Sequence, residues 1–143
     1  GFIGPAGAKV LSSRSVWWDQ EQWANGGCGG LAFHGEEFGP ICDATCYGSY
    51  GPAAVLDGVF LATTARVLNT IGLEKPDYLT GDWDFYDIHY TYSAKLANFT
   101  NKISPIILLH NSRGELVGRN SWHVNREQFT NKYRDKFPIT INE

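Results

Sequence analysis

The chain has 143 residues, enough for one domain with its own hydrophobic core. Hydrophobic residues make up 43% of it and charged residues 19%, a composition that excludes an intrinsically disordered protein. The net charge is −3 and the basic residues are scattered, so the sequence indicates neither a nucleic-acid partner nor binding to an anionic membrane. No apolar run approaches the ~20 residues that a bilayer-spanning helix needs, so no transmembrane segment is predicted.

The three cysteines, Cys28, Cys42 and Cys46, are an odd number, whereas a secreted disulfide framework is normally even and denser. We therefore expect free thiols in a reducing compartment and a cytoplasmic location, and the residues that follow Gly1 do not resemble a signal peptide. The spacing of Cys42 and Cys46 would place both thiols on one side of a helix, which leaves weak metal binding open as an alternative.

The first predicted element is a short strand over residues 8–11. Residues 12–52 are predicted to be a long irregular region, because glycine and proline are dense there and favour turns. A loop of that length in a compact domain is usually functional or mobile. Residues 55–61 alternate weakly and predict a second strand, which is broken by the turn signal Asp57-Gly58.

A short helix is predicted over residues 64–72. Thr63 or Thr64 can cap its N-terminus, and Gly72 is a typical residue at a helix C-terminus. Residues 73–82 are then predicted to form a loop.

A longer helix is predicted over residues 84–98, because Ile88, Tyr92 and Leu96 recur at four-residue spacing and form one apolar stripe.

The last predicted elements are a buried strand over residues 103–110 and a helix over residues 122–133. Pro105 cannot donate a hydrogen bond to a neighbouring strand, so pairing is expected to start after it. Asn120 or Ser121 can cap the final helix. The alternation of strands and helices predicts an α/β fold, a single domain over 1–143 with a small mixed sheet flanked by helices.

Four segments, taken in order, resemble the carboxyl-terminal half of a nucleotide-sugar glycosyltransferase of the GT-A fold, most nearly the bacterial glycosyltransferase-like branch of the family 2 enzymes. The segments are residues 7–11 together with 16–18, residues 55–63, residues 83–88 and residues 106–112. The resemblance covers nearly the whole chain. It implies a partial GT-A domain with a long glycine-rich irregular region, and without the N-terminal half that binds the nucleotide.

The resemblance also implies roles for single residues. Asp87 matches the catalytic base, which takes the proton from the acceptor hydroxyl. Asp57 and Gly58 match the segment beside the donor sugar, where glycine lets a backbone approach closely. Tyr86 belongs to the same set of donor- or acceptor-binding residues. His110 matches a position from which some relatives contact the metal or the diphosphate.

Trp17, Trp18 and Trp83 complete the predicted site, because aromatic rings can stack on sugar faces. Each candidate also has a plainer interpretation. The carboxylate of Asp87 can be a helix cap, His110 an ordinary hydrogen-bonded residue, Asp57-Gly58 a turn and the tryptophans core residues.

A divalent cation, Mn²⁺ or Mg²⁺, is expected for the full-length family member, whose first half carries an Asp-x-Asp motif. The pair Asp82 and Asp84 lies at the wrong point of the resemblance to replace that motif, so we expect this chain to bind no metal by itself. Its acids more simply mark a helix N-terminus, whose dipole favours negative charge. The same dipole is expected to lower the pKa of Asp87 and to keep it ionised.

The resemblance implies a glycosyltransferase fragment that acts in cell-envelope biogenesis. It would transfer a sugar, with inversion, from a nucleotide-sugar donor to a saccharide or other acceptor, and would be inactive without the missing half. The alternative is a non-catalytic carbohydrate-binding or assembly module. Because an absent half would leave a sheet edge and an apolar face uncovered, a homo-oligomer is expected.

Overall fold

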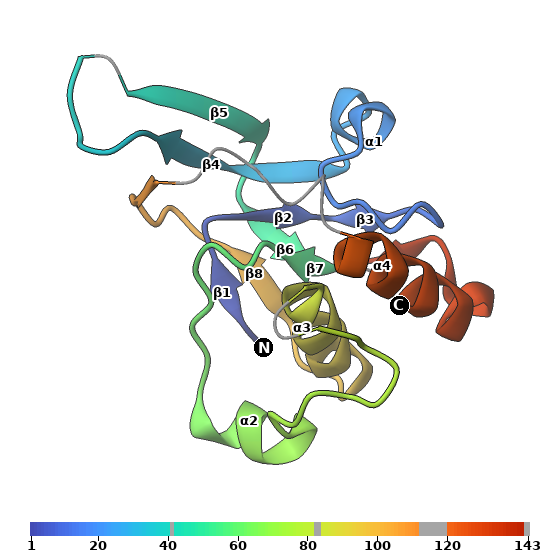
Figure 1. The fold of residues 1–143 in the computed structure, drawn as a ribbon. Coiled ribbons are helices and arrows are strands. Elements are labelled where there is room, and N and C mark those ends of the chain that lie inside the picture. Colours follow the sequence, from blue (N-terminus) through green and yellow to red (C-terminus); the bar gives the residue numbers. More distant parts are fainter. Residues whose placement is uncertain (41, 82–83, 112–119, 142–143) are drawn as a thin grey trace.

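The computed structural model describes residues 1–40, 42–81, 84–111 and 120–141 (Figure 1). The strands in these residues are β1 (Ile3–Gly4), β2 (Ala6–Ala8), β3 (Val10–Leu11), β4 (Cys28–His34), β5 (Asp43–Gly48), β6 (Gly51–Ala53), β7 (Val55–Leu56), β8 (Asn101–Ile103), β9 (Leu109–His110) and β10 (Ile139–Thr140). The helices are α1 (Gln20–Ala24), α2 (Ala65–Ile71), α3 (Tyr86–Leu96) and α4 (Asn120–Lys132), followed by a 3₁₀ turn at Arg134–Lys136. The fold is therefore mixed α/β, as predicted.

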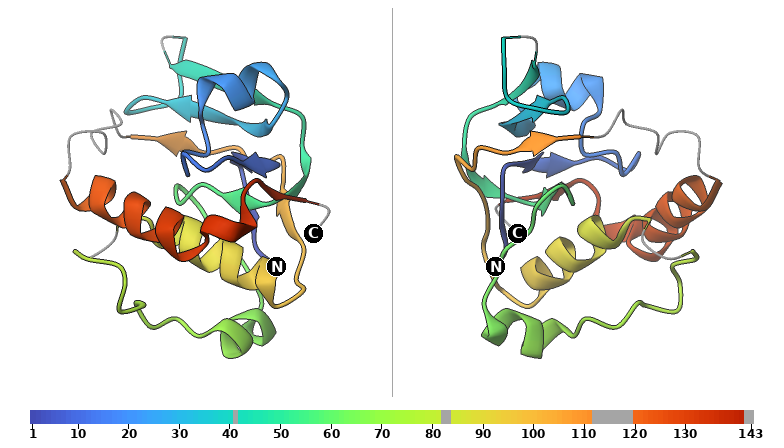
Figure 2. Two further views of the ribbon diagram at one scale, coloured as in Figure 1. Left: turned by 90° about the vertical axis from the view of Figure 1, so that its right-hand side faces the viewer. Right: turned by 60° about the vertical axis from the view of Figure 1, so that its left-hand side comes forward.

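The largest sheet has the strand order β5-β4-β2-β7, with β9 paired in parallel to β4. A second sheet has the order β1-β8-β6, and β3 pairs with β10. Helices α3 and α4 lie side by side on one side of the strands, and α1 lies on the other side (Figures 1 and 2). Within the described residues, no helix combines the length and the apolar character needed to cross a membrane.

The prediction of an irregular region over residues 12–52 is wrong. That region contains α1, β4, β5 and β6, and β4 is the longest strand described. Its glycines permit close packing: a Cβ at Gly30, whose φ is +105°, would overlap the carbonyl oxygen of Pro5 on the neighbouring chain segment. Composition alone does not separate glycine of this kind from glycine in turns.

The predicted helix over residues 64–72 is confirmed as α2. Thr64 is the N-cap and its hydroxyl accepts a hydrogen bond from the backbone N–H of Val67, while Gly72 ends the helix with φ of +75°.

The longer predicted helix is confirmed as α3, although it begins at Tyr86. Ile88 and Tyr92 are buried on its inner stripe, but Leu96 is 49% exposed because the helix ends there.

The predicted strand over residues 103–110 is wrong in its position. The chain forms β8 before Pro105 and β9 after it, and residues 104–108 belong to neither strand. Pro105 therefore separates two strands rather than delaying one. The predicted C-terminal helix is confirmed as α4, which begins at Asn120.

The larger hydrophobic core lies between the strands and the pair α3 and α4. The rings of Tyr92 on α3 and Phe129 on α4 are 5.8 Å apart, and Trp17 and Leu11 are buried in the same cluster. A smaller cluster around Val67 packs α2 against α3 and β8. This arrangement fixes the N-terminal end of α3 against the turn that follows β7.

Candidate functional site

A cavity of about 240 Å³ lies where the turn after β7 meets the start of α3. The residues that line it are Ser15, Trp17, Trp18, Asp57, Gly58, Val59, Asp84, Phe85, Tyr86, Asp87, Ile88, His110 and Trp122. They include every residue that the sequence proposed for the site except Trp83, which lies outside the described part of the chain. Residues from five separate segments of the sequence thus meet at one place.

Asp87 lies in the first turn of α3, and both of its carboxylate oxygens accept hydrogen bonds. The backbone N–H of Ile88 donates to Oδ1 over 2.9 Å, and the backbone N–H of Gly58 donates to Oδ2 over 2.9 Å. The second bond connects the helix to the turn after β7. The carboxylate is therefore held in one orientation by two different segments of the chain.

Asp57 is held in a similar way. The indole N–H of Trp17 donates to Oδ2 over 2.9 Å, and the backbone N–H of Val59 donates to Oδ1 over 2.8 Å. Trp17 is only 3% exposed, so its ring faces are covered by packing and do not offer a surface for sugar stacking. The predicted stacking role of Trp17 is not supported; its indole instead orients a carboxylate.

The predicted lowering of the pKa of Asp87 is wrong. Burial, together with the negative charge of Asp57, raises the pKa of Asp87 to about 7. The backbone N–H groups of Ile88 and Gly58 oppose this rise only in part. A carboxyl group with this pKa exchanges its proton near neutral pH, which suits a general base.

Burial also raises the pKa of Asp57. Four groups oppose the rise: the backbone N–H of Val59, the indole of Trp17, and the imidazoles of His110 and His34. Asp57 thus has more stabilising neighbours than Asp87, and its charge raises the pKa of Asp87. The two carboxyl groups therefore influence one another's protonation, and the negative charge of Asp57, after burial, contributes to the high pKa of Asp87.

Tyr86 and Gly58 contact each other closely. The Tyr86 hydroxyl donates to the carbonyl oxygen of Gly58 over 2.8 Å, and a Cβ at position 58 would lie 2.8 Å from Cζ of Tyr86 and 3.1 Å from Cβ of Asp87. Burial and the two neighbouring carboxyl groups raise the pKa of Tyr86 to about 12, so it stays a hydrogen-bond donor. Gly58 therefore makes room for protein side chains of α3.

His110 lies at the end of β9 and is the register partner of His34 at the end of β4. The two imidazole rings are 5.9 Å apart. His34 falls in the region predicted to be irregular, so the sequence does not predict that it lies next to His110. Among the described residues, no group of three His, Cys, Asp or Glu side chains has a geometry that holds a metal ion, so nothing described supports the metal role predicted for His110.

Aromatic rings also line the cavity. The ring centroid of Trp18, which is half-buried, lies 5.8 Å from that of Trp122 of α4. The ring centroids of Trp122 and Phe85 are 6.0 Å apart. The sequence proposed Trp18 but missed Trp122, because the predicted last helix carried no sign of which face meets the site. Of these rings only Trp18 is more than a few per cent exposed, and a ring of this kind can contact the C–H face of a sugar while the hydroxyl groups of the sugar meet the acids.

Two lining residues have strained backbone conformations. Phe85, immediately before α3, has φ of +72°, and Ser15 has φ of +54° and hydrogen-bonds Thr130 of α4 over 2.7 Å. Residues other than glycine rarely adopt positive φ, and such strain clusters at functional sites. The strained turn at Phe85 sets the direction in which α3 begins and so places Asp87.

Asp84 connects the segment before α3 to α4 through hydrogen bonds. It is 8% exposed, and its carboxylate accepts a hydrogen bond from the Ser121 hydroxyl at the start of α4. Asn125 of the same helix donates to the backbone carbonyl of Asp84 over 2.9 Å. Asp84 thereby ties α4, which carries Trp122, to the segment before α3. Its sequence neighbour Asp82 lies outside the described residues.

The three cysteines are free thiols, as predicted. Cys46 lies in β5 and Cys42 just before it, so the helical spacing considered for weak metal binding does not occur. Cys28 is buried, and its thiol donates a hydrogen bond to the carbonyl oxygen of Trp17. Burial raises the pKa of Cys28 to about 11, so the thiol keeps the proton that it donates.

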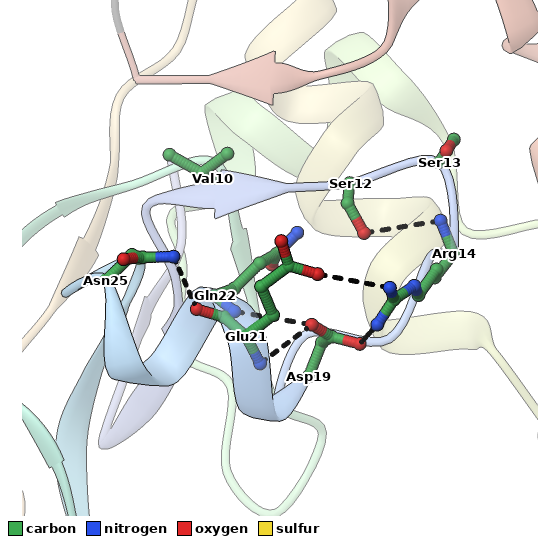
Figure 3. A pocket seen from close by; sticks show the side chains of 9 residues that line it. Val10, Ser12, Ser13, Arg14, Asp19, Glu21, Gln22 and Asn25 are labelled. Carbon is green, nitrogen blue, oxygen red and sulfur yellow. Dashed lines mark hydrogen bonds and ion pairs between the residues drawn. The ribbon is translucent and has the colours of Figure 1, made fainter.

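A larger groove, of about 400 Å³, lies between the turn after β3 and α1 (Figure 3). The guanidinium group of Arg14 in it pairs with Asp19 at 2.8 Å and with Glu21 at 3.1 Å. These three groups already pair with one another, and none of the residues proposed from the sequence lies there. We therefore place the candidate site in the smaller cavity.

The fold and the cavity define a mixed α/β protein with two interacting carboxyl groups and several aromatic side chains at one cavity. Comparison with known proteins adds no identity to this description. No family model matches the sequence, and no curated protein and no solved structure matches it significantly.

Proposed function

We propose that the cavity is the acceptor side of a nucleotide-sugar glycosyltransferase site and that Asp87 is its general base. The observation that supports this proposal most is the convergence of Asp87, Asp57, Tyr86, Trp18 and His110 on one cavity. The sequence predicts a role at the site for each of these residues. They come from segments that are far apart in the chain.

The proposed chemistry begins with the acceptor hydroxyl. This hydroxyl attacks the anomeric carbon of the donor sugar, the bond from that carbon to the nucleoside diphosphate breaks, and the configuration inverts. Asp87 receives the proton that the hydroxyl loses, and the diphosphate leaves with the bonding electron pair. A base whose pKa lies near the working pH is well matched to this step.

The other residues have supporting roles in this proposal. The negative charge of Asp57 holds the pKa of Asp87 high, and the Gly58 N–H orients its carboxylate. Tyr86 and Trp18 present ring surface to the sugar. In the GT-A enzymes that the chain resembles, the donor diphosphate is neutralised by Mn²⁺ or Mg²⁺ held on the nucleotide-binding half. In the proposal that half is supplied outside these 143 residues, so the chain alone binds nucleotide sugar weakly or not at all. The cytoplasmic location also stays a prediction.

A turnover assay on the full-length protein tests the role of Asp87. The change of Asp87→Asn keeps the shape of the side chain but removes the proton acceptor, so kcat should fall by about 10²–10⁴ while the circular dichroism spectrum is retained. The exposed Asp135→Asn is the matched control and should leave kcat unchanged. In the unaltered enzyme, kcat/KM should rise with pH through about 7, as Asp87 loses its proton.

Unchanged turnover in Asp87→Asn would remove Asp87 from the base role. The alternative proposal is a carbohydrate-binding or assembly module without catalysis, which the half-buried ring of Trp18 at the cavity favours. Saccharide binding by the unaltered full-length protein without any transfer from a panel of nucleotide sugars would support that alternative.

A further inference from the structure

The cavity has an electrostatic character that limits what can enter it. Asp57 and Asp87 both line it, and none of the described lining residues is a lysine or an arginine. Burial raises the pKa of both carboxyl groups, and Asp87, whose pKa is about 7, becomes charged as the pH rises above neutral. His110 is the one basic side chain among the described lining residues. A second negative group in this partly dehydrated space would meet a like charge and lose its water.

The size of the cavity is a second limit. About 240 Å³ lies below the ~300–1,000 Å³ of pockets that enclose drug-sized ligands. A single sugar ring is the natural occupant, and a longer glycan would extend out of the opening. The ring faces of Trp18 and Tyr86, both half-buried, suit the C–H face of a pyranose.

We propose that the acceptor unit entering this cavity is a single uncharged sugar or amino sugar, and that uronates and sugar phosphates are excluded. This inference rests on the proposed function and specifies its acceptor. Neutral hydroxyl groups can donate hydrogen bonds to the carboxylates of Asp57 and Asp87, whereas the carboxylate of a uronate can only accept hydrogen bonds and carries a like charge. An ammonium group on an amino sugar would meet a favourable charge.

The test uses nuclear magnetic resonance on the ¹⁵N-labelled 143-residue chain at pH 8. Matched pairs of methyl glycosides are titrated: glucoside and glucuronide, and galactoside and galacturonide, together with methyl glucosaminide. The signals followed are the amides of Gly58 and Val59 and the indole N–H of Trp18, all of which lie at the cavity. At least one neutral or amino glycoside should shift them, with its matching uronide binding at least tenfold more weakly.

The variant Asp87→Asn removes one negative charge from the cavity. The ratio between the dissociation constant of each uronide and that of its neutral partner should therefore fall at least threefold. The matched control, Asp135→Asn, changes an exposed carboxylate outside the cavity and should leave the ratio as it was. Amide spectra that retain the dispersion of the unaltered chain establish that both variants are folded.

Three outcomes contradict the inference. A uronide that binds as tightly as its neutral partner overturns it and leaves the proposed transferase function standing. If Asp87→Asn leaves the ratio of the two dissociation constants unchanged, the charge of Asp87 is not what excludes the uronide. The absence of any shift with all five glycosides overturns the inference and the acceptor assignment together.

Discussion

The side chain of Asp87 lies in the first turn of α3, where a helix dipole favours a carboxylate by about 0.3–1 kcal/mol. A rise in its pKa from 3.8 to about 7 corresponds to about 4 kcal/mol against the charged form. Burial and the charge of Asp57 therefore outweigh the dipole several-fold. A sequence shows that an acid begins a helix, but it does not show how much water the fold leaves around that acid.

Gly58 provides a test of packing at the residue scale. Because a Cβ at this position would lie 2.8 Å from Cζ of Tyr86, Gly58→Ala forces the ring or the turn to move and should cost about 1–3 kcal/mol of unfolding free energy. Gly39→Ala is the matched control, since a Cβ there meets no atom within 4 Å. Urea unfolding measures both changes, and equal stability of the two variants would show that the contact of Gly58 with Tyr86 is not tight.

At the scale of elements, α3 carries a second buried titratable group on the side that meets residues 73–81. The Nδ1 atom of His89 is hydrogen-bonded to the Tyr78 hydroxyl over 2.7 Å. Burial, aided by the positive charge of Lys132, lowers the pKa of His89 to about 4. His89 is therefore neutral in the folded protein near pH 6, whereas in the unfolded chain its ordinary pKa is 6.5.

The sign of the resulting pH effect follows from proton binding. Between pH 6.5 and about 4 the unfolded chain binds the His89 proton and the folded chain does not, so stability falls as the pH is lowered. The unfolding free energy of the unaltered chain, minus that of His89→Gln, should therefore fall by about 1 kcal/mol for each unit by which the pH is lowered in this window. Urea unfolding at pH 4.5, 5.5 and 6.5 measures the difference, and a constant difference contradicts the account.

The elements that the sequence predicts well are those with local signals. Helix α2 has a capping threonine at Thr64 and a terminal glycine at Gly72, and both act as expected. Strands β4 and β5 were missed because their glycines resemble turn signals, although Gly30 is required by the close approach of Pro5. That requirement comes from a residue 25 positions away, which no local pattern reveals.

For the candidate site, the sequence selected single residues better than it predicted what they do. Asp57, Asp87 and His110 were proposed and lie at one cavity. Trp17 was proposed as a stacking ring and instead donates its indole N–H to Asp57. Orientation and burial decide between these roles, and both depend on packing between distant segments. The same dependence explains why Trp122 was missed.

At the scale of the whole molecule, we expect a homo-oligomer. Among the described strands β5 is at the end of the largest sheet, and most of its side chains are exposed, so we expect its outer edge to pair with a second copy. Light scattering should then give about twice the 15.9 kDa of one chain. A lysine in the edge strand, Ala44→Lys, should shift the mass toward the monomer, while Asn69→Lys on α2 should not. A monomer at high concentration contradicts this expectation.

The role proposed for the cavity depends most on the interaction between the carboxyl groups of Asp57 and Asp87, and a titration of the Asp87 carboxyl carbon measures that interaction directly. The ¹³C signal, assigned by its loss in Asp87→Asn, should titrate with a midpoint of about 7 in the 143-residue chain. In Asp57→Asn the midpoint should be lower, because the neighbouring negative charge is gone. A midpoint near 3.8 in both proteins would contradict the pair, and with it the role proposed for the cavity.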